Sequence, residues 1–219
     1  MSVRPIKAKH AFFVVFALLT LFVFYVYETP FLDSNSPVWQ RVEPVKWWLL
    51  PHAVAGATGL LLAPFQFSAR LRRRRLGLHR VLGRLYVAGA AISAPTAIPI
   101  AIILGPPSLV MAATIQSVGW IVTTAIALYY VRKGDIRQHQ EWMIRSYPFA
   151  MIFVVARVII AIPAVGALGE VGVVSAVWTC EVLACSIPSL LISLRAQPRR
   201  AAASSSRPAV PHKTARAAV

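Results

Sequence analysis

Six long apolar runs limit what this chain can fold into more than any other feature of its sequence. About twenty consecutive apolar residues cross the hydrocarbon core of a bilayer, and only helices or closed barrels can do so. The runs are continuous rather than alternating in hydrophobicity, which favours helices over barrel strands. We therefore expect an all-α, polytopic transmembrane helical bundle with six spans, at about 10–27, 48–67, 81–104, 108–131, 142–162 and 171–194.

The composition agrees with a membrane protein. Of the 219 residues, 58% are hydrophobic and only 14% are charged, whereas soluble domains carry about 25% charged residues. Two cysteines, Cys180 and Cys185, lie in one apolar run and do not have the spacing of a metal site. The first run is longer than the core of a cleaved signal peptide and no small-x-small site follows it, so we interpret it as a retained anchor.

The lysines and arginines predict the orientation of the spans. With the N-terminus placed inside, 20 of the 23 Lys and Arg fall in inner segments, only Arg41 and Lys46 fall in outer ones, and Arg157 lies within a span. Short inner loops of multi-pass proteins carry this excess of positive charge. We expect both termini to be cytoplasmic and the membrane to be the plasma (cytoplasmic) membrane.

The most basic stretch, RLRRRRLGLHRVLGRLY at 70–86, lies between two predicted spans. Alone it is typical of a phosphate-binding nucleic-acid arm. Because it joins two membrane helices, we expect it instead to face anionic lipid headgroups through Arg70–Arg75, with no nucleic-acid partner. The Ala-, Ser-, Pro- and Arg-rich segment 196–219 is predicted to be a disordered basic cytoplasmic tail.

The second span, PHAVAGATGLLLAPFQF, carries one stripe of small and polar residues. The stripe consists of His52, Gly56, Gly59, Ala63 and Gln66, at offsets that return to one face of a helix. One interpretation is close helix packing through small residues, with His52 hydrogen-bonded to a neighbour. The other is a groove for a planar cofactor, haem b above all, with His52 as an axial ligand.

Two further histidines, His79 and His139, open the third and fifth predicted spans at the inner surface. Since His52 lies near the outer surface, it belongs to another depth. His79 and His139 together could hold haem iron or another metal at one inner site. The alternative is that each is an interfacial histidine bonded to a backbone carbonyl or to a lipid phosphate.

Two charges lie well away from the inner ends of the predicted spans, Arg157 in the outer half of the fifth and Glu181 near the middle of the sixth. A lone charge in the bilayer core is costly, and their depths differ by roughly 6 Å at 1.5 Å per helical residue. We therefore predict an ion pair between Arg157 and Glu181. It would clamp two helices together, relay protons or contact an anionic group such as a haem propionate.

Three motifs resemble a known family. They are PHAVAGATGLLLAPFQF, the HR-x-x-G-R-x-Y pattern in HRVLGRLY, and the H-x-x-W-M-x-R-S-Y pattern in HQEWMIRSY. Together they resemble the predicted membrane-protein family of domain of unknown function 2306, over about residues 46–160. Ala63 stands where that family usually has Gly.

The resemblance implies a multi-pass bacterial or fungal membrane protein without a settled activity. The positions that it marks in this sequence are His52, Pro64, Phe65, Gln66, His79, Arg80, Gly83, Arg84, Tyr86, His139, Trp142, Met143, Arg145, Ser146, Tyr147 and Arg157. The placement of histidines at helix ends also resembles, more distantly, the four-helix haem-b membrane cytochromes, which usually pair two histidines per haem. His52 has no histidine partner on its side.

Three functions stay open from the sequence. The first is haem b binding and membrane electron transfer, with His52, His79, His139, Gln66 and Arg157 as candidate cofactor-binding residues and His79 and His139 as candidate ligands of the haem iron. The second is a transporter or lipid-binding protein with a polar intramembrane cavity. The third is an assembly factor in which polar residues only join helices. No nucleophile–base pair can be assigned, which disfavours a hydrolase of soluble substrates. Whether the chain is an enzyme of another kind is not decided by the sequence.

Overall fold

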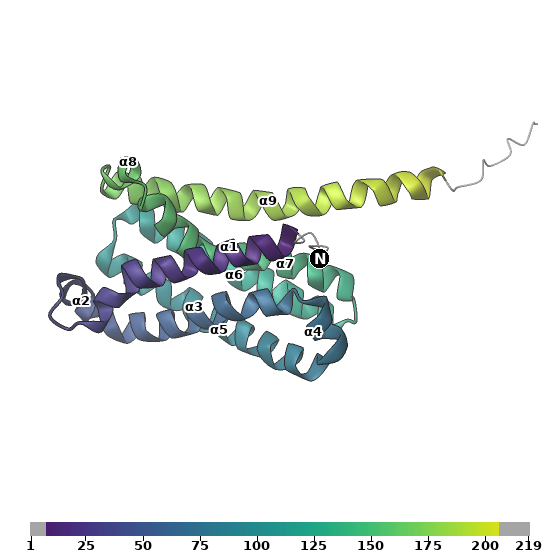
Figure 1. The fold of residues 1–219 in the computed structure, drawn as a ribbon, viewed down its shortest axis with the longest axis horizontal. Coiled ribbons are helices and arrows are strands. Elements are labelled where there is room, and N and C mark those ends of the chain that lie inside the picture. Colours follow the sequence, from purple (N-terminus) through teal and green to yellow (C-terminus); the bar gives the residue numbers. More distant parts are fainter. Residues whose placement is uncertain (1–7, 206–219) are drawn as a thin grey trace, which may run out of the picture.

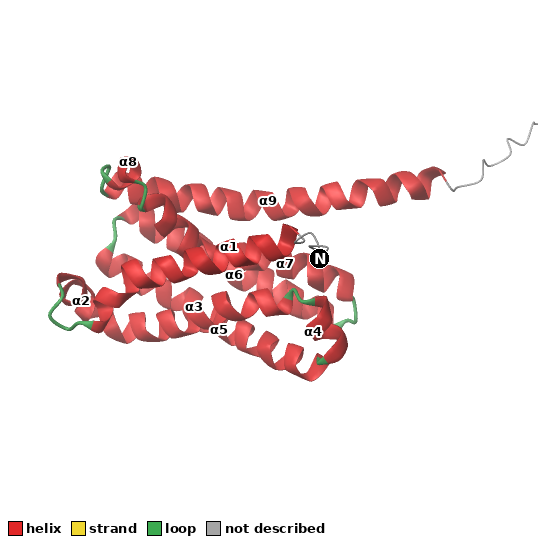
Figure 2. Cartoon of the chain, in the orientation of Figure 1, coloured by secondary structure: helices red, strands yellow, loops and turns green. Residues whose placement is uncertain are grey.

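The computed structural model describes the backbone of residues 8–205 and the side chains of residues 11–194. Within these residues all regular structure is helical (Figure 2). The elements follow one another as α1 (Ala8–Val23), η1 (Phe24–Glu28), η2 (Thr29–Leu32), α2 (Pro37–Val42), η3 (Glu43–Val45), α3 (Lys46–Gln66), α4 (Ala69–Arg74), α5 (Leu76–Leu104), α6 (Pro107–Arg132), α7 (Ile136–Ile160), α8 (Pro163–Gly166) and α9 (Glu170–Ser205).

Six of these segments are long and apolar enough to cross a membrane, which confirms the predicted all-α bundle. The third and fifth spans begin earlier than expected, at Leu76 and Ile136. The carboxylate of Asp135 explains the second shift, because it accepts a hydrogen bond from the backbone N–H of Gln138 at 2.9 Å and caps α7. His79 and His139 therefore lie in the first turns of continuous helices.

The centre of the molecule is a four-helix bundle of α3, α5, α6 and α7, in which α3 packs most extensively on α5. The long helices run side by side, with α1 and α9 outside the bundle (Figure 1). The bundle has two ends. We call the end beside the short helix α2 the α2 end, and the end beside α4 the α4 end. The sequence predicts that the α4 end faces the cytoplasm.

The distribution of side chains is that of a protein in lipid. Large apolar side chains stay exposed along the outer helix faces, for example Leu21 at 67%, Val54 at 67% and Leu190 at 59%. Polar side chains also lie inside, where all except Glu181 have a hydrogen-bond partner; the buried ones are Thr20, Gln66, Ser93, Ser117, Thr124, Ser146 and Glu181. In water this arrangement would expose apolar surface and hide polar groups, so lipid is the surrounding medium.

The last helix is longer than its predicted span. α9 continues to Ser205, so the structure places 196–205, the start of the predicted disordered tail, in helix. The rest of that tail, 206–219, lies outside the described residues. Lipid burial does not require this extension, because the segment 195–205, RAQPRRAAASS, carries three arginines.

Candidate functional site

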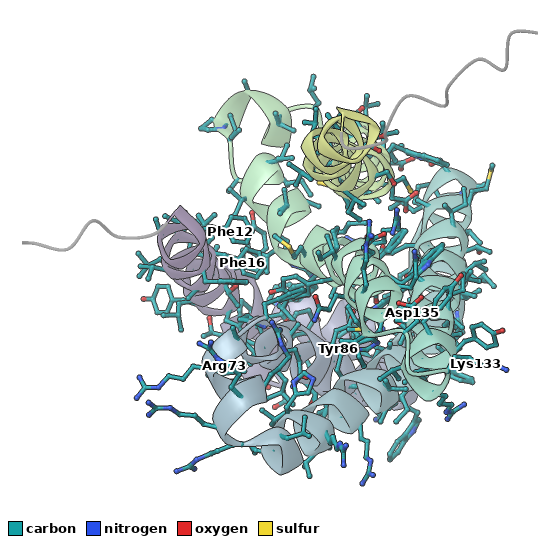
Figure 3. The ribbon with its side chains drawn as sticks, turned by 90° about the vertical axis from the view of Figure 1, so that its right-hand side faces the viewer. Phe12, Phe16, Arg73, Tyr86, Lys133 and Asp135 are labelled. Atoms are coloured by element: carbon teal, nitrogen blue, oxygen red, sulfur yellow. The ribbon has the colours of Figure 1, made fainter. Side chains whose placement is uncertain are left out.

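A buried polar cluster joins three helices at the middle of the bundle. The Tyr86 Oη atom on α5 and the Ser146 Oγ atom on α7 lie 2.7 Å apart and share a hydrogen bond. Trp120 Nε1 on α6 donates to Tyr86 Oη at 2.9 Å, and Thr124 Oγ1 lies 2.7 Å from Ser146 Oγ. We call these four residues the central cluster. Figure 3 shows Tyr86 among the helices, seen from the α4 end.

The central cluster sets the relative position of the two histidines at the α4 end. His79 precedes Tyr86 by seven residues, and His139 precedes Ser146 by seven. Seven residues are almost two helical turns, or roughly 10 Å of rise, and they return to nearly the same helix face. Since Tyr86 and Ser146 are hydrogen-bonded across the bundle, His79 and His139 lie at similar depth, on about the same faces of α5 and α7 and nearer the α4 end. His139 is accordingly among the groups close enough to His79 for electrostatic interaction.

The two imidazole rings are half-buried, and a partner holds the Nδ1 atom of each. His139 Nδ1 lies 2.9 Å from the backbone carbonyl of Ala127 on α6. That carbonyl can only accept, so the ring carries its hydrogen on Nδ1 and leaves the lone pair of Nε2 free. This is the tautomer of a histidine that binds a metal through Nε2.

Gln66, at the end of α3, holds His79. With its amide nitrogen facing the ring, Gln66 donates to His79 Nδ1 at 2.8 Å and to the His79 carbonyl at 3.2 Å, and it accepts from the N–H of Gly83 at 3.3 Å. Arg72 donates from Nη1 to the Gln66 backbone carbonyl at 3.0 Å. In this arrangement His79 carries its hydrogen on Nε2. To bind a metal there, the hydrogen must move to Nδ1 and the amide must turn so that its oxygen accepts it.

His52 lies toward the α2 end, in a different environment. Its Nδ1 atom is 2.9 Å from the carbonyl of Ser93 and 3.2 Å from the Ser93 hydroxyl, both on α5. A Cβ on Gly56 would come within 2.9 Å of Ser93 Oγ, and one on Gly89 would come within 2.6 Å of the carbonyl of Ala55. α5 therefore lies directly in the small-residue stripe of α3. The structure supports the packing interpretation of this stripe, with α5 where a planar cofactor would have to lie.

The predicted ion pair between Arg157 and Glu181 is wrong. Arg157 Nη2 lies 3.4 Å from Glu28 Oε1, in the π-helical turn that continues α1. Tyr27 adds a contact by donating from its hydroxyl to the Arg157 carbonyl at 3.3 Å. The Glu28 oxygen has no hydrogen bond of good geometry, so the pair depends on charge rather than on a directed hydrogen bond.

Helix ends explain this error. Arg157 lies three residues before the end of α7 at Ile160, whereas Glu181 lies eleven residues after the start of α9 at Glu170. At 1.5 Å per residue the two differ in depth by roughly 12 Å, about twice the expected separation. The carboxyl group of Glu181 is buried, with its side chain 2% exposed and neither oxygen hydrogen-bonded. Glu28 was overlooked because the first span was expected to end at residue 27.

The candidate cofactor-binding residues thus lie in two separate places. Gln66, His79 and His139 lie together at the α4 end, whereas His52 and Arg157 lie toward the α2 end. The central cluster between them contains Trp120 and Thr124, which sequence reasoning missed. A single Trp or Thr in an apolar helix gives no signal, because both residue types are common in membrane spans and only their partners distinguish them.

Comparison with known proteins supports assignment to a family, but not to an individual relative or a solved structure. The chain matches the model of a family described as a predicted membrane protein, domain of unknown function 2306, over residues 49–193. A search of curated proteins and a search of solved structures each gave no match. The family region covers more than half of the chain and contains the four-helix bundle almost completely. The chain is therefore a member of the predicted membrane-protein family of domain of unknown function 2306.

Proposed function

We propose that this integral membrane protein binds one haem b at the α4 end, between His79 and His139, and passes single electrons at the inner face of the plasma membrane. The observation that carries the proposal is the equal spacing of the two histidines from the central cluster. This spacing supports a bis-histidine site, because it returns both histidines to a similar depth and to about the helix faces from which two imidazoles would have to reach one iron.

The set of possible ligands favours haem over zinc. A structural zinc ion takes four protein ligands, and a catalytic one takes three. Among residues 11–194, whose side chains are described, no group of three His, Cys, Asp or Glu residues could hold a metal ion. A porphyrin supplies four of the six iron ligands itself, so two histidines are sufficient.

The surroundings of the histidines also suit haem. Arg72 and Arg80 are close enough to His79 for electrostatic interaction, and such cations would attract the two haem propionates. The carbonyl of Ala127 already fixes His139 in the required tautomer. For His79, the Gln66 amide would turn and accept from Nδ1–H, which would free Nε2 for the iron. When bound, haem would supply the one-electron chemistry, while the chain would hold and orient it.

Difference spectra of the purified full chain, loaded with hemin and then reduced, test the proposal. We expect the Soret and alpha bands of a six-coordinate b-type haem, at one haem per chain. His79→Ala and His139→Ala should each remove this signature. His52→Ala is the matched control and should keep it, because His52 bonds to Ser93 at the other end of the bundle.

Circular dichroism separates loss of haem from loss of folding. A helical, monodisperse chain that shows no b-type bands after loading would overturn the proposal. So would a chain in which His52→Ala removes the bands while His79→Ala and His139→Ala keep them.

A further inference from the structure

We infer that the elbow between α3 and α4 is a binding site for a lipid with a phosphomonoester headgroup. The site is a surface hollow of about 370 Å³ at the α4 end. It is lined by Phe65, Ser68, Arg70, Leu71, Arg74 and Arg75. Its position, its charge and its apolar side each point to the same ligand, and none of them depends on haem.

The hollow forms because the chain turns sharply after the α3 span. Ser68 begins α4, and its hydroxyl accepts a hydrogen bond from the backbone N–H of Leu71 at 3.3 Å. Within α4, Arg70 and Arg74 are four residues apart and therefore lie on one face. The turn lays this face against the last part of α3, where Phe65 is 58% exposed.

Not all of the neighbouring arginines belong to this site. Arg72 turns toward the bundle, where it donates to the Gln66 carbonyl at 3.0 Å. Arg73 is exposed and points away from the molecule (Figure 3). Only Arg70, Arg74 and Arg75 line the hollow, and none of them takes part in an ion pair formed within residues 11–194.

Three unpaired guanidinium groups around one hollow favour a phosphomonoester over a phosphodiester. A phosphomonoester carries about −1.5 to −2 charge near pH 7 and presents three unesterified oxygens. A phosphodiester carries a single charge and presents two such oxygens. Arginine binds phosphate through paired N–H groups, so the extra oxygen gives the third arginine a partner.

The apolar side of the hollow identifies the ligand as a lipid rather than free phosphate. Phe65 and Leu71 contribute apolar surface that an inorganic ion cannot use. One turn deeper along α3, Leu61 is 49% exposed and lies on the same face as Phe65. An acyl chain would follow these side chains into the bilayer while its headgroup stays among the arginines.

Native mass spectrometry of the full chain, released from detergent with added lipid, tests this site. The probes are phosphatidic acid, the phosphodiester lipid phosphatidylglycerol and zwitterionic phosphatidylcholine. We expect retention in that order, with a clear gap between the first two. Replacing Arg70, Arg74 and Arg75 together by Gln should weaken phosphatidic acid binding on the order of a hundredfold, because each arginine contributes roughly fivefold near an anionic headgroup.

The control removes three charges elsewhere at the same end, by replacing Arg73, Arg132 and Lys133 with Gln. It should leave phosphatidic acid binding within about twofold, since these residues lie outside the hollow. If both triple variants weakened phosphatidic acid binding equally, general electrostatic attraction would account for the binding and the proposed site would be overturned. Equal retention of phosphatidic acid and phosphatidylglycerol would overturn the headgroup assignment. Displacement of phosphatidic acid by millimolar inorganic phosphate would overturn the lipid assignment.

Discussion

The two ends of the four-helix bundle each contain histidine, but they treat it differently. Toward the α2 end, His52 lies where α3 and α5 nearly touch, and α5 binds its ring through the Ser93 carbonyl. At the α4 end, His79 and His139 lie at similar depth on α5 and α7, and their Nδ1 atoms are held by Gln66 on α3 and by the Ala127 carbonyl on α6. Gly77, near the start of α5, is exposed on the surface, and a Cβ there would meet nothing within 4 Å. His52 is therefore bound between two helices that pack closely, whereas His79 and His139 are each bonded to a different neighbouring helix.

Adding one methyl group where α3 and α5 pack closely, and one at the exposed start of α5, gives the sharpest test of this packing. In Gly89→Ala the new Cβ would come within 2.6 Å of the Ala55 carbonyl, so α3 and α5 must separate. We expect a loss of about 3 kcal/mol in the free energy of unfolding, at the upper end of typical overpacking costs. Unfolding in mixed micelles with increasing denaturing detergent measures it.

The control carries the same change at the α4 end. Gly77→Ala meets no neighbour, and alanine favours helix over glycine, so the chain should gain up to about 1 kcal/mol. If both variants lost the same stability, the close approach of α3 and α5 at Gly89 would not explain the loss.

The next largest loss of stability is expected from breaking the Arg157–Glu28 ion pair toward the α2 end. Arg157→Leu leaves the Glu28 carboxylate without its partner, and we expect a loss of about 1–2 kcal/mol in the free energy of unfolding. The value is below that of a fully buried pair, because the Arg157 and Glu28 side chains keep 31% and 24% of their exposure. The loss should appear as a lower thermal midpoint in detergent.

A double-mutant cycle with Glu28→Leu checks that the two residues act as a pair. The double variant should recover part of the loss, since neither charge is then left alone. Additive losses in the two single variants would show that Arg157 and Glu28 do not interact.

Glu181, on α9, extends the comparison to a buried carboxyl group. Both of its oxygens lack a hydrogen bond although the side chain is only 2% exposed. A buried polar group without a partner costs stability, so Glu181→Leu should raise the free energy of unfolding by about 1 kcal/mol. The same detergent titration measures it. A lower stability would mean that Glu181 has a stabilising partner in the membrane.

The sequence predicted the spans better than it predicted which residues meet. The small-residue stripe of α3 was correctly placed on one face, because its spacing depends on helix geometry alone. The pairing of Arg157 failed, because its depth depended on helix ends that were displaced by a few residues. Glu28 became its partner only because the chain continues as a π-helical turn beyond the expected end of the first span.

In the candidate site, too, the sequence predicted some features, whereas others came only from the structure. His79 and His139 were both identified from sequence as inner, interfacial residues. Their shared depth was expected from the sequence, but the helix faces on which they lie became evident only when Tyr86 and Ser146 were found in contact across the bundle. Nothing in the local sequence connects residues 60 positions apart, so this contact could not be derived from either motif.

By itself, the sequence determined the all-helical class, the number of spans and the lipid environment. These features depend on the hydrophobicity of about twenty consecutive residues, which is a local property of the sequence. The orientation of the bundle stays a prediction from the distribution of Lys and Arg. Only the tertiary structure decided which polar groups meet: His52 with Ser93, Arg157 with Glu28, and the central cluster that aligns His79 with His139. Those contacts depend on how close the helices approach and how they are rotated, and both are set by packing between distant segments.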